Sequence, residues 1–113
     1  MLKSVFVVSL AVAIGIGSAR GRTVLGQGIT SCDGWTRAQG PEQSTLETWI
    51  AGYLSSFNSL TDDASAPDFL KDEDWDGLIA WMDNYCATHP LDKLAKAAQA
   101  LELELLNHHL APP

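Results

Sequence analysis

Apolar residues recur every three or four positions in three stretches of this chain, with polar residues between them. The first stretch places its apolar residues on one helix face: Leu46, Trp49, Ile50, Tyr53, Leu54 and Phe57. The second, from Asp72 to Cys86, has a stripe made of Trp75, Leu78, Ile79, Met82, Tyr85 and Cys86. The third steps along Leu91, Leu94, Ala98, Leu101 and Leu105. No stretch alternates as a strand does. The pattern therefore predicts an all-α fold, a small bundle of three main helices.

The first helix should begin at Ser44. Ser44 followed by Glu47 fits a capping box, in which Ser44 is the N-cap and Glu47 bonds back to it. Gly40-Pro41 is a turn signal just before it. After the helix, residues 61–71 are a polar loop in which we expect Phe69 and Leu70 to fold back as a short apolar plug.

The second helix starts among acidic residues, which suit the positive end of a helix dipole. It should stop at Thr88-His89-Pro90, because proline cannot continue a helix and disfavours helical geometry just before it. His89 is then an exposed capping residue, and Pro90 occupies the first turn of the last helix.

Three segments make up the predicted organisation. Residues 1–19 have the layout of a secretory signal peptide: a basic start at Lys3, an apolar run and a small-residue end at Ala19. The run of about 12 residues is shorter than the ~20 that span a bilayer. Residues 20–43, rich in Gly, Thr, Ser and Gln, should form an extended N-terminal arm pinned at Cys32 and Trp35. Residues 44–110 form the helical domain.

The chain has two cysteines, and export would place them in an oxidising compartment, the periplasm or the outside. They predict one disulfide, Cys32–Cys86, which closes a loop of about 55 residues and contributes ~4 kcal/mol in the chain-entropy treatment. A lipoprotein is the competing interpretation, because Ile29-Thr30-Ser31-Cys32 is similar to a lipidation box. The apolar run, however, ends at Ile16, far upstream of Cys32.

Charge narrows the range of partners. The chain has 14 Asp and Glu residues against 7 Lys and Arg, a formal net charge of −7. Nucleic-acid binding needs clustered cations, and anionic lipid likewise attracts basic segments. The acidic balance therefore argues against both, and after signal cleavage we expect no membrane attachment. The charge is compatible with either a protein or a small molecule as the partner.

One acidic motif is similar to a calcium loop. Asp72-x-Asp74-x-Asp76-Gly77 with Asp83 at the twelfth place matches the ligand order of an EF-hand. The twelfth residue is Asp rather than the bidentate Glu, and Pro67 leaves only a few residues for an entering helix. An acidic helix start is the favoured interpretation.

The histidines and serines predict neither a metal site nor a catalytic site. Glu104 and His108 are one helical turn apart and His109 is adjacent, but neighbouring histidines on a helix point in different directions. Cations at a helix C-terminus are favourable without a metal. No serine has an evident oriented histidine and carboxylate. We therefore expect a non-enzymatic protein without a cofactor.

The aromatic residues are the candidate protein-binding groups. Trp49, Tyr53 and Phe57 lie on the inward stripe of the first helix and are most simply core, but a loosened acid state would expose them. Trp81 falls off the stripe of its helix, where it either covers the disulfide or arm or is an exposed anchor of the kind enriched in interfaces.

Two resemblances bear on function. The signal peptide, the cysteine before a helix and the pattern Tyr85-Cys86-x-x-x-Pro90-x-x-x-Leu94 resemble the small periplasmic HdeA/HdeB-like proteins. That resemblance implies an all-α, single-disulfide domain and an acid-stress chaperone that holds unfolded clients. The family chaperones are rich in lysine, whereas this chain past residue 19 has only Lys71, Lys93 and Lys96.

The stretch from Trp49 to Ser55 is also similar to the Gly-Tyr helix of secreted immunity proteins of the Tai type. This resemblance implies an alternative function, an immunity or inhibitor protein that neutralises one toxin or enzyme partner. Both expectations describe a non-enzymatic, periplasmic protein-binding domain.

Overall fold

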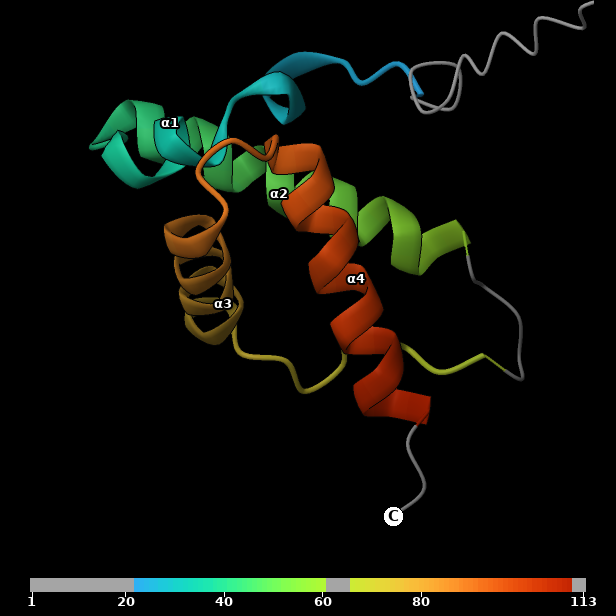
Figure 1. The fold of residues 1–113 in the computed structure, drawn as a ribbon. Helices are drawn as coiled ribbons and strands as arrows, with labels where there is room; N and C mark the ends of the chain where they lie inside the picture. The colour runs from blue at the N-terminus through green and yellow to red at the C-terminus, as the bar shows by residue number, and fades with distance from the viewer. Residues whose placement is uncertain (1–21, 61–65, 111–113) are drawn as a thin grey trace, which may run out of the picture.

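The computed structural model describes residues 22–60 and 66–110, and these form a helical domain. Its elements are η2 (Gly26–Ile29), α1 (Cys32–Arg37), α2 (Pro41–Leu60), α3 (Trp75–Thr88) and α4 (Leu94–Leu110) (Figure 1). The prediction of an all-α fold with three main helices, an N-terminal arm and one disulfide is confirmed. The expected signal peptide, residues 1–19, lies outside the described residues.

Helix α2 begins three residues before the predicted start, so the capping box at Ser44 is wrong. Gly40 has a φ of 59°, and Pro41 then occupies the first helical position, where its missing N–H costs nothing. The Ser44 N–H already donates to the Gly40 carbonyl at 3.1 Å, inside the helix. Glu47 accepts from the Gln43 side chain instead of bonding back to Ser44.

The N-terminal arm is more regular than predicted. Its described part holds the 3₁₀ turn η2, which packs on α2 and α4, and then the short helix α1, which packs on α3. Gly28 of η2 is buried, and a Cβ at this position would overlap the Trp49 ring. The Trp49 indole N–H also donates to the Leu25 carbonyl at 3.0 Å. Close approach of a tryptophan therefore explains why a glycine stands at 28.

The connection from α2 to α3 turns back onto the bundle. Phe69 is 4% exposed and stacks on Phe57 at 5.6 Å, so the predicted apolar plug is confirmed for this residue. Asn58 holds the turn in place: its Oδ1 accepts from the Phe69 N–H and its Nδ2 donates to Asp68. Asp72 follows with a φ of 65°, a conformation that aspartate adopts more readily than most residues.

The connection from α3 to α4 differs from the prediction. Pro90 precedes α4 rather than opening it, and the helix begins at Leu94. The carbonyls of Pro90 and Asp92 instead accept from the backbone N–H groups of Asp33 and Cys32. His89 is the exposed C-cap of α3, as predicted, and its ring stacks on Tyr85 at 4.0 Å.

The core fills the space between α2, α3 and α4, and the predicted stripes supply most of it. Its fully buried side chains are Leu46, Ile50, Leu54, Met82, Leu94, Leu101, Cys32 and Cys86. The prediction of an inward-facing side chain is wrong for two residues. Trp75 is 38% exposed because it is the first residue of α3, and Leu91 is 92% exposed because it precedes α4.

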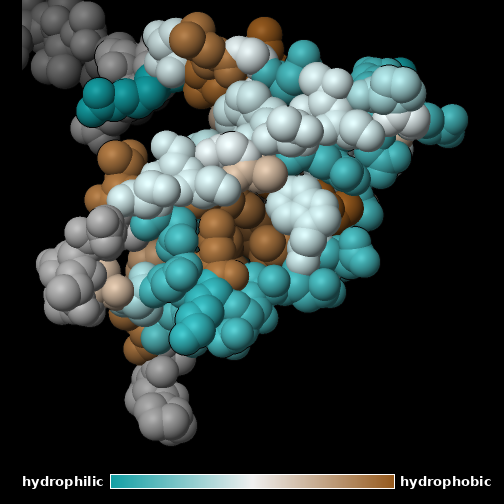
Figure 2. Space-filling view, turned by 180° about the vertical axis from the view of Figure 1, so that it is seen from behind, coloured by the Kyte–Doolittle hydropathy of each residue, from teal (hydrophilic) through white to brown (hydrophobic). Residues whose placement is uncertain are grey.

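Apolar surface also reaches the outside of the bundle. Figure 2 shows apolar atoms in the middle of the rear face, framed by hydrophilic ones.

No helix among residues 22–60 and 66–110 has the length and apolarity required to cross a bilayer.

Candidate functional site

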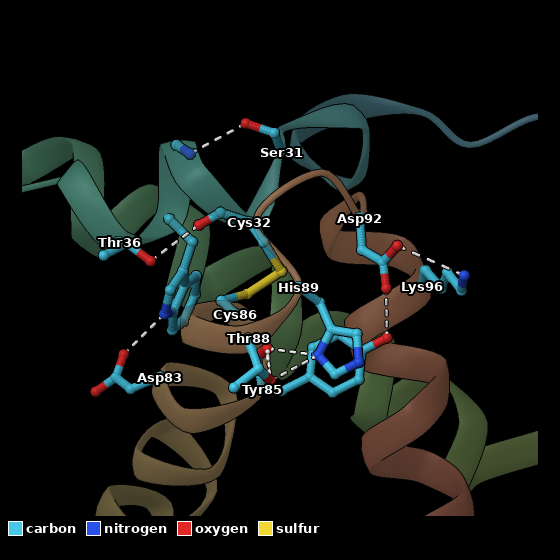
Figure 3. Close-up of a disulfide and its surroundings, with 12 residues drawn as sticks. Ser31, Cys32, Thr36, Asp83, Tyr85, Cys86, Thr88, His89, Asp92 and Lys96 are labelled. Carbon is cyan, nitrogen blue, oxygen red and sulfur yellow. Dashed lines mark hydrogen bonds and ion pairs between the residues drawn. A yellow bond between two sulfur atoms is a disulfide. The ribbon is translucent and has the colours of Figure 1, made fainter.

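Cys32 and Cys86 form a disulfide whose Cα atoms are 4.7 Å apart, joining the start of α1 to the end of α3 (Figure 3). Both side chains are buried, and neither cysteine is free. Around the bridge, the Ser31 side chain caps α1 by accepting from the Gly34 N–H, and Thr36 donates to the Cys32 carbonyl. The bond is structural, since a buried cystine offers no thiolate for chemistry.

The arm is fastened to the α3–α4 loop by backbone bonds beside the disulfide. The Cys32 N–H donates to the Asp92 carbonyl at 2.7 Å, and the Leu94 N–H donates to the Thr30 carbonyl at 2.8 Å. Trp35 is 5% exposed, and its indole N–H donates to Asp83 at 2.8 Å. The predicted pinning of the arm at Cys32 and Trp35 is therefore confirmed.

Three of the four candidate protein-binding residues lie together. Trp49, Tyr53 and Phe57 are half-buried on α2 and line an open groove of about 610 Å³. Its other lining residues are Thr48, Gly52, Ser56 and Leu60 from α2 and Glu102 from α4. The walls are mostly apolar, and Leu60 at one end is 84% exposed. The described domain therefore carries an accessible aromatic groove in its folded state.

Internal contacts hold the groove's aromatic rings in place. Trp49 stacks on Tyr53 with ring centroids 5.6 Å apart. The Tyr53 hydroxyl donates to Glu102 at 2.8 Å. Burial, then the hydrogen bond to Glu102 and its negative charge raise the pKa of Tyr53 to about 12. Glu102, the charged residue among the described residues that line the groove, thus already accepts a hydrogen bond from a neutral phenol.

Gly52 is one of the residues that line this groove. Apart from its chain neighbours and the nearby backbone of α2, no atom comes within 4 Å of the place where its Cβ would be. A close approach of another backbone, one of the two explanations offered by the sequence, does not occur within the described residues. A side chain at this position would instead extend into open space beside the groove.

Trp81, the fourth candidate, lies on a different surface. It packs against the core from α3, stacks on Tyr85 at 5.4 Å and lines a separate hollow with Glu73, Glu104 and His108. It therefore shares no surface with Trp49. The groove brings together Trp49, Tyr53 and Phe57 and leaves Trp81 out.

The acidic motif of the second helix forms a helix start. The Asp74 side chain is the N-cap of α3 and accepts from the Gly77 N–H at 3.2 Å. Asp83, the twelfth position of the calcium pattern, lies two turns along α3 and accepts from Trp35. A chain that is helical from Trp75 onward cannot wrap these carboxylates around one ion, since an EF-hand loop turns at its sixth residue.

His108 and His109 have a partner that the sequence did not predict. Glu104 is not the partner of His108; both His108 and His109 contact Glu73, at 3.4 and 3.3 Å. His89 contacts the Tyr85 carbonyl and the Thr88 hydroxyl at the end of α3. Because Glu73 is 36 residues from His109, no local spacing could have indicated the cluster.

Another interaction that sequence spacing did not indicate joins Tyr85 to Asp92. The Tyr85 hydroxyl donates to Asp92 at 2.6 Å, and Lys96 approaches the same carboxylate at 3.5 Å (Figure 3). This hydrogen bond is the main cause that lowers the pKa of Asp92. Burial, then the bond to Asp92 and its charge raise the pKa of Tyr85 to about 12. The pair ties the end of α3 to the loop that precedes α4.

Comparison with known proteins adds no assignment: no protein-family model, no curated protein and no solved structure matches this chain.

Proposed function

We propose that this chain is an exported, non-enzymatic protein-binding domain, and that it takes an apolar segment of a partner polypeptide in the groove along α2. The observation that carries the proposal is the exposed groove lined by Trp49, Tyr53 and Phe57 over an open Gly52. Aromatic side chains bury large apolar areas at low entropic cost, which makes them common anchors in interfaces.

The shape of the groove favours a polypeptide over a small ligand. Its α2 residues run from Thr48 to Leu60, roughly 18 Å of helix at 1.5 Å per residue. Small-molecule sites are more enclosed and present several convergent polar groups. Among the described residues that line this groove, the charged group is Glu102, and it already accepts from Tyr53. An amphipathic helix lying along α2 would bury its apolar face in such a groove.

The net negative charge of the chain indicates the charge that a partner segment should carry. The chain has a formal net charge of −7, and two of its cations are already paired, Arg37 with Asp33 and Lys96 with Asp92. A basic segment would be steered to this surface, since complementary charge speeds encounter. The occupant we propose is therefore an apolar segment with basic flanks.

Secretion to the periplasm or beyond is part of the proposal. The Cys32–Cys86 disulfide supports it, because such bonds persist mainly in oxidising compartments. The layout of residues 1–19 would supply the export signal.

Two roles fit such a domain. The first is the chaperone implied by the HdeA/HdeB-like resemblance, and the acid behaviour that we expect of the domain supports it. Hydrogen bonds to Asp68 and Asp92 lower the pKa of both carboxyls, and each bond fastens a turn or loop. Their stabilisation is present above the unfolded pKa and is lost as pH falls through the folded one. The disulfide would persist, so the acid state would be loosened but tethered, with the aromatic stripe of α2 free to hold clients.

The alternative role is an immunity or inhibitor protein that docks on one partner, as the Tai-type resemblance implies. The observation that favours it is that the groove exists in the folded protein and needs no acid opening. The two roles therefore predict different partners at neutral and at acid pH.

The test is affinity capture from periplasmic extract at pH 7 and pH 3, using the wild-type chain and Gly52→Leu. Leucine at Gly52 has open space and is a good helix former, so it should fill the groove without unfolding α2. Ala80→Leu is the matched control, since it adds a similar side chain at an exposed position of α3.

Many clients at pH 3 together with suppressed aggregation of an acid-labile client would support the chaperone. One stoichiometric partner at pH 7 would support the inhibitor. In either case, capture should fall at least tenfold for Gly52→Leu and stay unchanged for Ala80→Leu. Capture that Gly52→Leu leaves intact would refute the groove as the binding site.

A further inference from the structure

A carboxylate and two imidazoles converge where the loop before α3 meets the last turn of α4. The groups are Glu73, His108 and His109, and one ligand atom of each lies within 4.8 Å of the other two. Oε1 of Glu73 is 3.4 Å from Nδ1 of His108 and 3.3 Å from Nε2 of His109. These two carboxylate–imidazole distances are close to those between neighbouring ligands of one metal ion about 2 Å from each.

Neighbouring histidines can serve together here because each presents a different ring nitrogen. Nδ1 lies close to the backbone and Nε2 lies farther out on the ring, so side chains that leave the helix in different directions can still approach one point. Glu73 reaches that point from another element, the loop between α2 and α3. The different directions of the two neighbouring histidines therefore do not prevent a shared site, because the third ligand comes from outside α4.

The surroundings leave the cluster accessible but partly shielded. The side chains of Glu73 and His109 are 20% and 22% exposed, whereas that of His108 is 73% exposed. Phe69 packs edge-on against the His109 ring at 5.9 Å. Glu73 and His108 also border a hollow of about 360 Å³. The hollow offers room for a water ligand.

We propose that Glu73, His108 and His109 bind a borderline divalent transition-metal ion, with Zn²⁺ as the ion that fits best. Two imidazoles and one carboxylate suit Zn²⁺, whereas Ca²⁺ and Mg²⁺ prefer oxygen ligands throughout. Water would complete a tetrahedral site. The bound ion would fasten the loop before α3 to the end of α4, two segments that otherwise meet through Phe69 and the Glu73 contacts.

The test is calorimetric titration of the tag-free, oxidised, metal-stripped protein with Zn²⁺ at pH 7.5. We expect one Zn²⁺ per chain and a higher melting temperature with Zn²⁺. Glu73→Gln, His108→Asn and His109→Asn should each weaken binding at least tenfold and remove the thermal shift. His89→Asn is the matched control, because His89 caps the other end of α3, away from Glu73, and this variant should bind Zn²⁺ as the wild type does.

Circular dichroism establishes that each variant keeps its helices, so a lost signal cannot come from unfolding. No stoichiometric binding below 1 mM Zn²⁺ would overturn the proposal, leaving the cluster an ion pair only. Binding that persists in His108→Asn and His109→Asn would overturn it as well. So would displacement of Zn²⁺ by an equal concentration of Ca²⁺, because that would require an oxygen site.

Discussion

The indole N–H of Trp35 donates to Asp83 at 2.8 Å, across 48 residues of sequence. This contact joins α1 to the middle of α3, one turn before Cys86. It also explains two features of the sequence together, a tryptophan inside a polar arm and an aspartate on the calcium-like spacing.

Asp83→Ala should lower the free energy of unfolding by about 1 kcal/mol, because the buried indole loses its acceptor. Asp83→Asn should cost less, since the amide oxygen can still accept. Urea denaturation measures both, and Asn84→Ala serves as the control, because Asn84 is exposed on the same helix and lies away from its first turn. Equal effects of Asp83→Ala and Asn84→Ala would show that the bond contributes nothing.

Removing the disulfide should have the largest effect of any local change. Cys32→Ser with Cys86→Ser should lower the free energy of unfolding by about 4 kcal/mol in the chain-entropy treatment, for a sequence separation of 54. The comparison is chemical denaturation of the oxidised wild type against the double variant. Mass mapping of non-reduced peptides should find the Cys32–Cys86 pair, and a lipid on Cys32 would contradict the assignment.

Asp74 should act as a cap and not as a calcium ligand. Asp74→Ala should cost about 1 kcal/mol, and Asp74→Ser should retain most of that stability. Titration with calcium at physiological salt should give no saturable signal for any of these proteins. A submillimolar calcium affinity that Asp74→Ala removes would instead establish an EF-hand.

The Tyr85–Asp92 pair should make stability depend on pH at both extremes. The lowered pKa of Asp92 means that its contribution is present above the unfolded pKa near 4 and is lost as pH falls through the folded value. The raised pKa of Tyr85 means that its contribution is present below the unfolded pKa near 10 and is lost as pH rises toward about 12.

Tyr85→Phe should therefore flatten both the acid and the alkaline limbs of the stability profile. Tyr53→Phe is the comparison, and it should flatten the alkaline limb, because the pKa of Tyr53 is also raised to about 12. Urea denaturation from pH 2 to pH 11 gives both profiles. An acid limb that Tyr85→Phe leaves unchanged would rule out Asp92 as an acid-sensitive contact.

Gly52→Ala should stabilise the protein by about 1 kcal/mol, since alanine is the better helix former and its Cβ meets no atom within 4 Å. Thermal unfolding measures the change. Gly28→Ala should have the opposite effect, because the added Cβ would overlap the Trp49 ring. Destabilisation by Gly52→Ala would mean that the space beside Gly52 is not open.

The sequence by itself determined the three main helices and most of the core. A helix repeats every 3.6 residues, so a stripe such as Leu46, Ile50 and Leu54 marks a buried face before any partner helix is known. Cysteine pairing was equally direct, because a chain with two cysteines allows only one intramolecular disulfide. The start of α2 was predicted wrongly, because two signals competed: the helix begins at Pro41, after Gly40, and not at the capping box of Ser44.

Only the tertiary structure decided which apolar faces stay open and which distant groups meet. Trp49 and Leu46 belong to one stripe, yet Leu46 is buried and Trp49 borders a groove, because exposure depends on where α4 and η2 pack. Glu73 reaches His109 because the loop after α2 folds back over the end of α4. Local periodicity describes a residue's own helix, whereas such contacts depend on the path of the chain between helices.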